Sequence, residues 1–192
     1  MMTAQAGPAP PAPWLSDALL AIRASEGDED AFALLVRRHS RSLLLLATHI
    51  LGNPQDAEEA VQDAFVSAWR RLPEFRHGAA FTTWIYRITV NRCLNARRRR
   101  RPPLPLDEVA EPAAHEARSS PSRTAEEDAA LAALATALGG LKADQRVCWV
   151  LREVHGFSYT EIAHMTGASE EAVRGRLFRA RRSLKEAMAP WR

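Results

Sequence analysis

The C-terminal part of the chain carries residues whose chemistry suits contact with duplex DNA. The stretch SYTEIAHMTGASEEAVRGRLFRARRSL joins a short helical pattern to a longer one through a turn at Gly167, which is the spacing of a helix-turn-helix. One face of the longer helix is apolar and is expected to face the core, with Val173, Leu177, Ala180 and Leu184. The opposite face holds Glu171, Arg174, Gly175, Phe178, Arg179 and Arg182. Arginine binds phosphates or guanine edges and an aromatic ring contacts thymine methyl groups, so this face is suited to DNA.

The alternative for this face is an ordinary solvated basic helix with one stray aromatic residue. In that case Gly175 would cost the helix about 1 kcal/mol relative to alanine without any compensation. A close approach of a DNA strand to the helix backbone would compensate for it. The turn spacing and the charged face agree, so we favour DNA binding.

A second stretch, FTTWIYRITVNRCLNARRRRR at 81–101, is both aromatic and basic. As a helix, it places Tyr86, Val90 and Leu94 on one apolar face. A second stripe combines aromatic, amide and basic side chains at Trp84, Arg87, Ile88, Asn91, Asn95 and Arg98. Unpaired bases stack on aromatic rings and arginine follows the backbone, so this stripe predicts contact with an opened DNA strand. The arginines at 97–101 are expected to meet phosphates and to add affinity rather than sequence choice.

An acidic stripe lies on the preceding helical pattern, which begins with Asn53 as the cap and Pro54 as the first helical residue. Its inward positions are apolar, at Val61, Phe65, Ala68 and Leu72. Its outward positions are Asp56, Glu59 and Asp63. Acids in the first turn are favoured by the helix dipole, which explains Asp56 well and Asp63 poorly. The stripe is therefore better suited to a basic protein surface than to DNA.

Catalytic and metal-binding chemistry finds little support in the sequence. Glu161 and His164 have the spacing of half a di-iron carboxylate site, but no second pair exists, so a surface or packing histidine is favoured. No glycine-rich phosphate loop, GxSxG motif or Cys/His cluster occurs. Cys93 and Cys148 are far apart and are expected to be small core residues. We expect no cofactor, no metal and no enzyme activity.

These residues must be positioned by helices, since no strand-like alternation occurs. Helices are expected at 15–24, 29–51, 54–72, 81–101, 126–138, 142–154, 158–167 and 170–188. The fold class expected is all-α, with two small helical domains joined by a flexible linker. The expected division of the chain is a disordered extension at 1–13, a first domain at 14–101, a Pro- and Ala-rich linker at 102–125 and a second domain at 126–192.

Charge is distributed unevenly over the 192 residues, although the formal net charge is only +3. Basic residues crowd 87–101 and 174–185, whereas acids crowd 56–63 and 107–128. Such segregation suggests separate partners for separate surfaces, with nucleic acid for the basic ones. The N-terminus lacks the features of a signal peptide and the longest apolar run is too short for a bilayer, so we expect a cytoplasmic protein without membrane insertion.

The order of these motifs resembles the extracytoplasmic-function group of the sigma-70 family. The resemblance covers about 15–188, through DEDAFALLVRRHSRSLLLLA, NPQDAEEAVQDAFVSAWRRLPEF, FTTWIYRITVNRCLNARRRR and the C-terminal helix-turn-helix. It implies a promoter-specificity subunit of bacterial RNA polymerase with sigma regions 2 and 4. It also implies three partners, namely the polymerase core (β′ clamp helices and β flap), promoter DNA and an anti-sigma factor.

The resemblance assigns roles to individual positions. Binding to the polymerase core would use Asp56, Glu59, Gln62, Asp63 and Phe65. Contact with the opened −10 element would use Phe75, Arg76, Trp84, Arg87, Asn91 and Arg98, with the loop at 75–80 forming a pocket for a flipped base. Reading of the −35 duplex would use Arg152, Tyr159, Glu171, Arg174, Gly175, Arg176, Phe178, Arg179 and Arg182. Family members often have serine where this chain has Gly175. The rival hypothesis is a stand-alone helix-turn-helix regulator, against which the acidic stripe beside the aromatic one argues.

Overall fold

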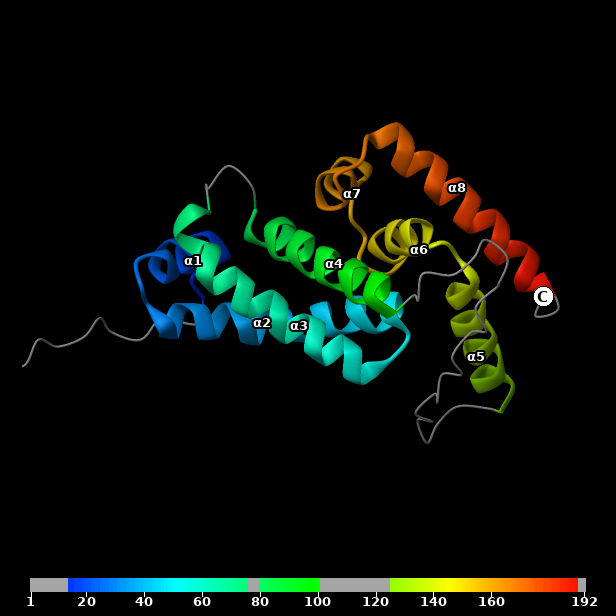
Figure 1. Ribbon diagram of the computed structural model, residues 1–192, viewed down its shortest axis with the longest axis horizontal. Coiled ribbons are helices and arrows are strands. Elements are labelled where there is room, and N and C mark those ends of the chain that lie inside the picture. The colour runs from blue at the N-terminus through cyan, green and yellow to red at the C-terminus, as the bar shows by residue number, and fades with distance from the viewer. Residues whose placement is uncertain (1–13, 76–79, 101–124, 190–192) are drawn as a thin grey trace, which may run out of the picture.

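The structure is a computed structural model that describes residues 14–75, 80–100 and 125–189 (Figure 1). The described residues form helices joined by short turns, in agreement with the all-α expectation. The helices are α1 (Asp17–Ser25), α2 (Glu29–Leu51), α3 (Pro54–Arg71), α4 (Phe81–Arg100), α5 (Ala125–Gly140), α6 (Ala143–Trp149), α7 (Tyr159–Thr166) and α8 (Glu170–Ala187), with a 3-10 turn η1 (Leu72–Glu74) after α3 and a π-helical turn η2 (Val150–Val154) after α6.

Polar caps set the starts of most of these helices, as the sequence predicts. Asn53 accepts hydrogen bonds from the main-chain N–H groups of Gln55 and Asp56 at the start of α3. Ser158 and Glu161 form a capping box at the start of α7, and Ser169 accepts from the N–H of Ala172 at the start of α8.

The N-terminal half, α1 to α4, is a bundle in which α2, α3 and α4 pack against one another. Its buried side chains include the predicted inward positions of α3, Val61, Phe65, Ala68 and Leu72, together with Cys93. Burial raises the pKa of the Cys93 thiol to about 12, so this cysteine is an inert core residue, as expected.

The C-terminal half is built around α6. In Figure 1, α6 lies between the N-terminal bundle and α8, and it packs against both α2 and α8. The sequence predicted one helix over 142–154, but the helical turns widen at η2 and end in left-handed Gly156, with φ +74°. The wide turn lets Val147, Cys148, Val150 and Leu151 all be buried, because α6 and η2 are covered on several sides.

The two halves correspond to the two small helical domains that the sequence predicted, and their buried side chains meet in one hydrophobic core. α7 packs against α4, and one cluster of buried side chains runs from Leu20 to Leu177 through both halves. The predicted linker at 102–125 lies, apart from its last residue, outside the described residues. Among the helices that the structure describes, none has the length and apolar character needed to cross a membrane.

Candidate nucleic-acid interface

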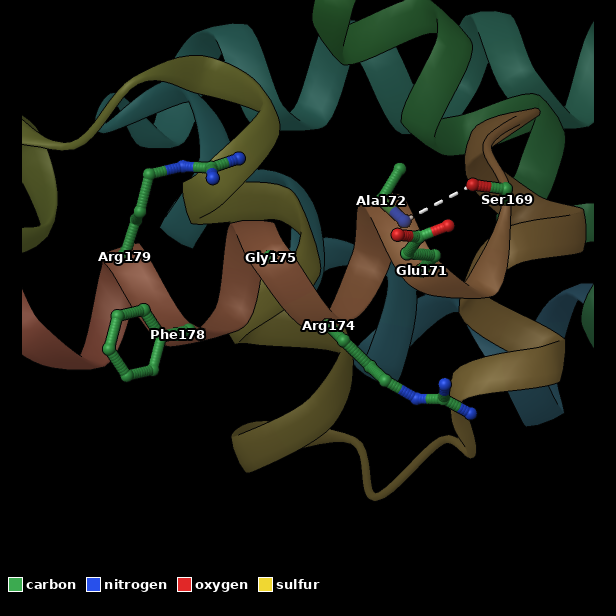
Figure 2. A pocket seen from close by; sticks show the side chains of 7 residues that line it. All are labelled: Ser169, Glu171, Ala172, Arg174, Gly175, Phe178 and Arg179. Atoms are coloured by element: carbon green, nitrogen blue, oxygen red, sulfur yellow. Dashed lines mark hydrogen bonds between the residues drawn. The ribbon is translucent and has the colours of Figure 1, made fainter.

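The N-terminal half of α8 carries a shallow hollow on its exposed side. The hollow is lined by Ser169, Glu171, Ala172, Arg174, Gly175, Phe178 and Arg179 (Figure 2). Figure 2 shows the side chains of Arg174, Phe178 and Arg179 projecting outward from α8 on either side of Gly175. Phe178 is 68% exposed, an unusual position for a phenylalanine. The buried face of α8 is the predicted one, with Val173, Leu177, Ala180 and Leu184. The structure therefore brings most of the predicted duplex-reading residues onto one surface.

Two arginines lie against the ring of Tyr159. The guanidinium carbon of Arg152 is 5.2 Å from the ring centre and that of Arg174 is 5.9 Å from it. Arg152 also donates a hydrogen bond from Nη1 to the carbonyl of Phe157 at 2.9 Å. Arg152 and Tyr159 therefore fix the turn between η2 and α7 and orient Arg174 beside the hollow.

Gly175 leaves the centre of the hollow without a side chain of its own. A Cβ atom built there would meet only the guanidinium of Arg179, with Nη1 3.4 Å away. The helix backbone is thus accessible at this point, and Arg179 lies across it.

Three of the expected −35 residues are already paired, and the first is Arg174, whose Nη2 lies 3.4 Å from Glu170 Oε2. Arg176 was expected to contact DNA, but its Nε lies 3.0 Å from Asp144 Oδ2 and its side chain is 25% exposed. It faces α6 because it lies beside the buried Leu177 rather than beside Phe178. Arg182 is exposed and pairs with Glu186 one turn later on α8.

On α4, an exposed polar row lies above an aromatic cluster. Arg87, Asn91, Asn95 and Arg98 are exposed. Trp84 is half-buried, with its ring centre 4.9 Å from that of Phe75 and 5.8 Å from that of Phe81. Trp84 is thus the aromatic residue of this row, and the rings of Phe75 and Phe81 pack against it.

Several expectations for this row are corrected by burial. Phe75, expected to contact the opened strand, is 8% exposed and supports Trp84 instead, and Ile88, placed on the same stripe, is 6% exposed. Arg97, expected at phosphates, donates to the carbonyl of Ile50 at 3.4 Å. Ile88 was placed outward by helical periodicity, Phe75 was assigned by the family resemblance and Arg97 by its charge, and none of these signals contains the packing between distant segments. Arg76 lies outside the described residues.

On α3, the acidic surface is present but Phe65 is not part of it. Glu59, Gln62 and Asp63 are exposed, and Asp56 is half-buried. Phe65 is 8% exposed and packs edge-on against Phe32, with ring centres 6.4 Å apart. Phe65 therefore contributes to the core, as its inward position in the helical pattern indicated, and its role in partner contact stays a prediction.

Comparison with known proteins identifies the family. Residues 35–102 match Sigma-70 region 2 and residues 131–184 match Sigma-70, region 4. The RNA polymerase sigma-H factor of Pseudomonas aeruginosa is 36% identical over 91% of this chain and 94% of its own length. The ECF RNA polymerase sigma-E factor of Escherichia coli (strain K12) is 33% identical over 92% of this chain and 96% of its own length.

The chain belongs to the extracytoplasmic-function group of the sigma-70 family. Among solved structures, CnrH in complex with the cytosolic domain of CnrY is similar, with a TM-score of 0.70 and 31% identity over 91% of this chain and 97% of that one. The acidic surface of α3 and the row on α4 fall within the match to region 2, and the hollow on α8 falls within the match to region 4.

One surface residue of this sigma factor was missed by the sequence analysis. Val66 is 51% exposed on α3, three residues after Asp63 and therefore on the same face. Its position at helical spacing from Glu59 and Asp63 was a usable signal, since an apolar residue on a polar face is out of place. Val66 adds an exposed apolar residue at the C-terminal end of the acidic surface.

The weak metal-site pattern has a structural explanation. The Glu161 carboxylate accepts hydrogen bonds from the hydroxyl and the main-chain N–H of Ser158, and these bonds hold the pKa of Glu161 below its usual value. His164 is exposed. Within the described ranges, no group of three or more His, Cys, Asp or Glu residues is placed to hold a metal ion.

Proposed function

We propose that this sigma factor brings RNA polymerase core enzyme to promoters, reads the −35 element as a duplex with α8 and holds the opened −10 strand on α4. The observation that carries the proposal is the presence of two chemically different nucleic-acid surfaces on one chain. The α8 surface combines arginines with an exposed Phe178, and the α4 surface combines arginines with amides and a half-buried Trp84.

The α8 surface fits the major groove of a duplex. A helix enters this groove, where arginine reads guanine and a ring contacts the thymine methyl group. Arg174 is oriented by Tyr159, and Phe178 already projects into solvent. Gly175 has no side chain to keep a strand from the helix backbone, and the flexible guanidinium of Arg179, which lies over this point, can turn toward the strand.

The α4 surface fits an unpaired strand. Base flipping costs a few kcal/mol, and stacking on an aromatic side chain returns roughly 1–3 kcal/mol per base. Trp84 is held from below by Phe75 and Phe81, so little ordering is needed when a base stacks on it. Arg87 and Asn91, one turn later, would hold the backbone and base edges beside it.

The surface of α3 fits a basic partner surface with an apolar spot, which we assign to the β′ clamp helices of the core enzyme. Glu59 and Asp63 would steer the association and Val66 would supply buried apolar area. The β flap is proposed to hold the C-terminal half, and a cognate anti-sigma factor is proposed as the inhibitor. This function places the protein in the cytoplasm, with the polymerase and the chromosome.

Purified chain tests the proposal when it is mixed with core polymerase alone. We expect co-elution with core and transcription from a promoter that has both elements. If the chain binds −35 duplex but neither binds core nor starts transcription, it is a stand-alone helix-turn-helix regulator and the proposal is wrong.

A further inference from the structure

Two polar contacts cross the boundary between the N-terminal and C-terminal halves. The first joins the Tyr86 hydroxyl on α4 to Nδ1 of His155, after η2, at 3.1 Å. The Tyr86 ring also packs edge-on against Phe157, with ring centres 4.8 Å apart. This contact joins residues that are 69 positions apart in the sequence.

The second contact is made by Arg146 of α6, which is 4% exposed. Its Nη1 donates to the carbonyl of Ile50 in the last turn of α2 at 3.0 Å, and its Nη2 donates to the carbonyl of Gly139 near the end of α5. Carbonyl ends of helices carry partial negative charge, so one guanidinium satisfies two helix ends, one from each half.

Burial of the Arg146 charge costs free energy of desolvation. Among the described residues it pairs with no carboxylate, and its Nε has no hydrogen-bond partner. Burial and the nearby charge of Arg97 lower the pKa of Arg146 to about 10, which still leaves it protonated at neutral pH. When the two halves part from this closed arrangement, the Arg146 charge regains hydration, which offsets part, but not all, of what its two hydrogen bonds contribute to closure.

The closed arrangement leaves the proposed binding surfaces exposed but holds them close together. α7 packs against both α4 and α8. The axes of packed helices lie 8–10 Å apart, so two such contacts and half the length of a helix keep the α4 and α8 surfaces within about 40 Å of each other. The −10 and −35 elements lie about 25 base pairs apart, or about 85 Å along a straight duplex. One closed chain therefore cannot contact both elements at once.

The sequence allows the halves to separate. Residues 101–124 lie between the described parts of the two halves, and a segment of that length reaches about 80 Å when fully extended. The exposed acids of α3 remain accessible in the closed arrangement, so a partner can dock there before the halves part.

We propose that Arg146 and the Tyr86–His155 pair form a latch that keeps the free sigma factor closed, and that this latch must open before one chain can contact both promoter elements. The inference rests on the proposed function, because opening matters only if one chain must contact both promoter elements. The latch itself can be tested on the chain alone.

Spin labels on the full chain measure the opening. Gln55 on α3 and Lys185 on α8 are exposed and suit replacement by cysteine for labelling, whereas Cys93 and Cys148 are buried. Pulsed electron spin resonance then gives the distance distribution between the two labels. We expect one short population in the free chain and a long one after addition of core polymerase and promoter DNA.

Variants of the latch residues show whether these contacts hold the chain closed or only form when the halves pack together. Tyr86→Phe removes one hydrogen bond between the halves and should raise the ratio of open to closed chains about five-fold; the other bond of this hydroxyl, to Ser42, lies within the N-terminal half. Arg146→Met should raise it at least about tenfold, since hydrogen bonds to charged groups contribute more. Arg181→Gln breaks the Arg181–Glu153 pair within the C-terminal half and should leave the ratio unchanged.

The outcomes separate the two proposals. A free wild-type chain that is already open, or latch variants that leave the distances unchanged, overturn the latch even if core binding is normal. If core does not bind at all, the proposed function fails, while the distances in the free chain still judge the latch. Circular dichroism checks that Arg146→Met keeps its helices, and Tyr86→Phe carries the test if it does not.

Discussion

The indole ring of Trp84 rests against the ring of Phe75, with the ring centres 4.9 Å apart and the planes tilted by 45°. Phe75 is buried, and Phe81, also buried, packs against the same indole with ring centres 5.8 Å apart. The half-buried Trp84 therefore has a fixed position at the start of the exposed row on α4. Preorganisation of this kind lowers the ordering cost when a base stacks.

Trp84→Ala should impair promoter opening more than the formation of the initial duplex complex. Loss of one stacked base corresponds to roughly 1–3 kcal/mol, so the open fraction should fall about tenfold or more. Permanganate reactivity of unpaired thymines measures opening, and filter binding measures the initial complex. Trp14→Ala, at an indole that is 84% exposed elsewhere, is the control. Equal losses in both assays would argue against a role in strand opening.

Asp63→Arg should weaken binding to core polymerase and leave the binding of an isolated −35 duplex intact. Reversal of an exposed charge opposite a basic partner costs affinity, and we expect at least a tenfold loss, or about 1.4 kcal/mol. Fluorescence anisotropy measures both affinities. Glu26→Arg makes the same charge change at the exposed end of α1 and should bind core normally. If Asp63→Arg lost both activities, the fold rather than the surface would be affected.

Gly175→Ala and Gly167→Ala should change stability in opposite directions. A Cβ at Gly175 would contact only the flexible end of Arg179, at 3.4 Å, and the backbone is helical, so alanine should stabilise α8 by up to about 1 kcal/mol. Gly167 ends α7 with φ +65°, where a side chain is strained, so alanine should destabilise the protein by about 1 kcal/mol. Urea denaturation of both variants measures the difference. A stabilised Gly167→Ala would contradict the assigned turn.

The features that the sequence predicted are local ones. Asn53 and Ser158 cap their helices through neighbours two or three residues away, so the pattern of residue types is sufficient. The inward positions of α3 follow from helical periodicity in the same way. The contact between Tyr86 and His155 depends on how two helical units dock, which no local pattern contains.

The buried state of Arg146 shows the same limit. Nothing in the sequence around it distinguishes it from a solvated arginine, because its partners are the carbonyls of two helix ends from distant segments. The burial of Phe75 likewise has no periodic signal, since this residue follows a proline-containing turn. Arg176 was assigned by its residue type, and its pairing with Asp144 became visible only when α6 was placed beside α8.

Acidification should open the latch through His155. Burial, together with the charge of His49 on α2, lowers the pKa of His155, and its Nε2 has no hydrogen-bond partner. Tyr86 faces it from α4 and stays neutral, because burial raises the pKa of that hydroxyl. Above a pH of about 6.5, His155 is neutral in both arrangements and the closed one keeps its full stability. Below that pH the open form binds a proton more readily than the closed form, so the closed arrangement loses stability as the pH falls.

The spin-label pair on α3 and α8 measures this effect when it is followed from about pH 7.5 to about pH 5.5. The long-distance population of the wild-type chain should grow at the acidic end. His155→Gln can still bond to the Tyr86 hydroxyl but cannot become charged in this range, so its distances should not change with pH. His164→Gln removes an exposed histidine of α7 and should keep the wild-type response. If His155→Gln opened on acidification as the wild type does, another group would control the closed arrangement and His155 would be only a packing residue.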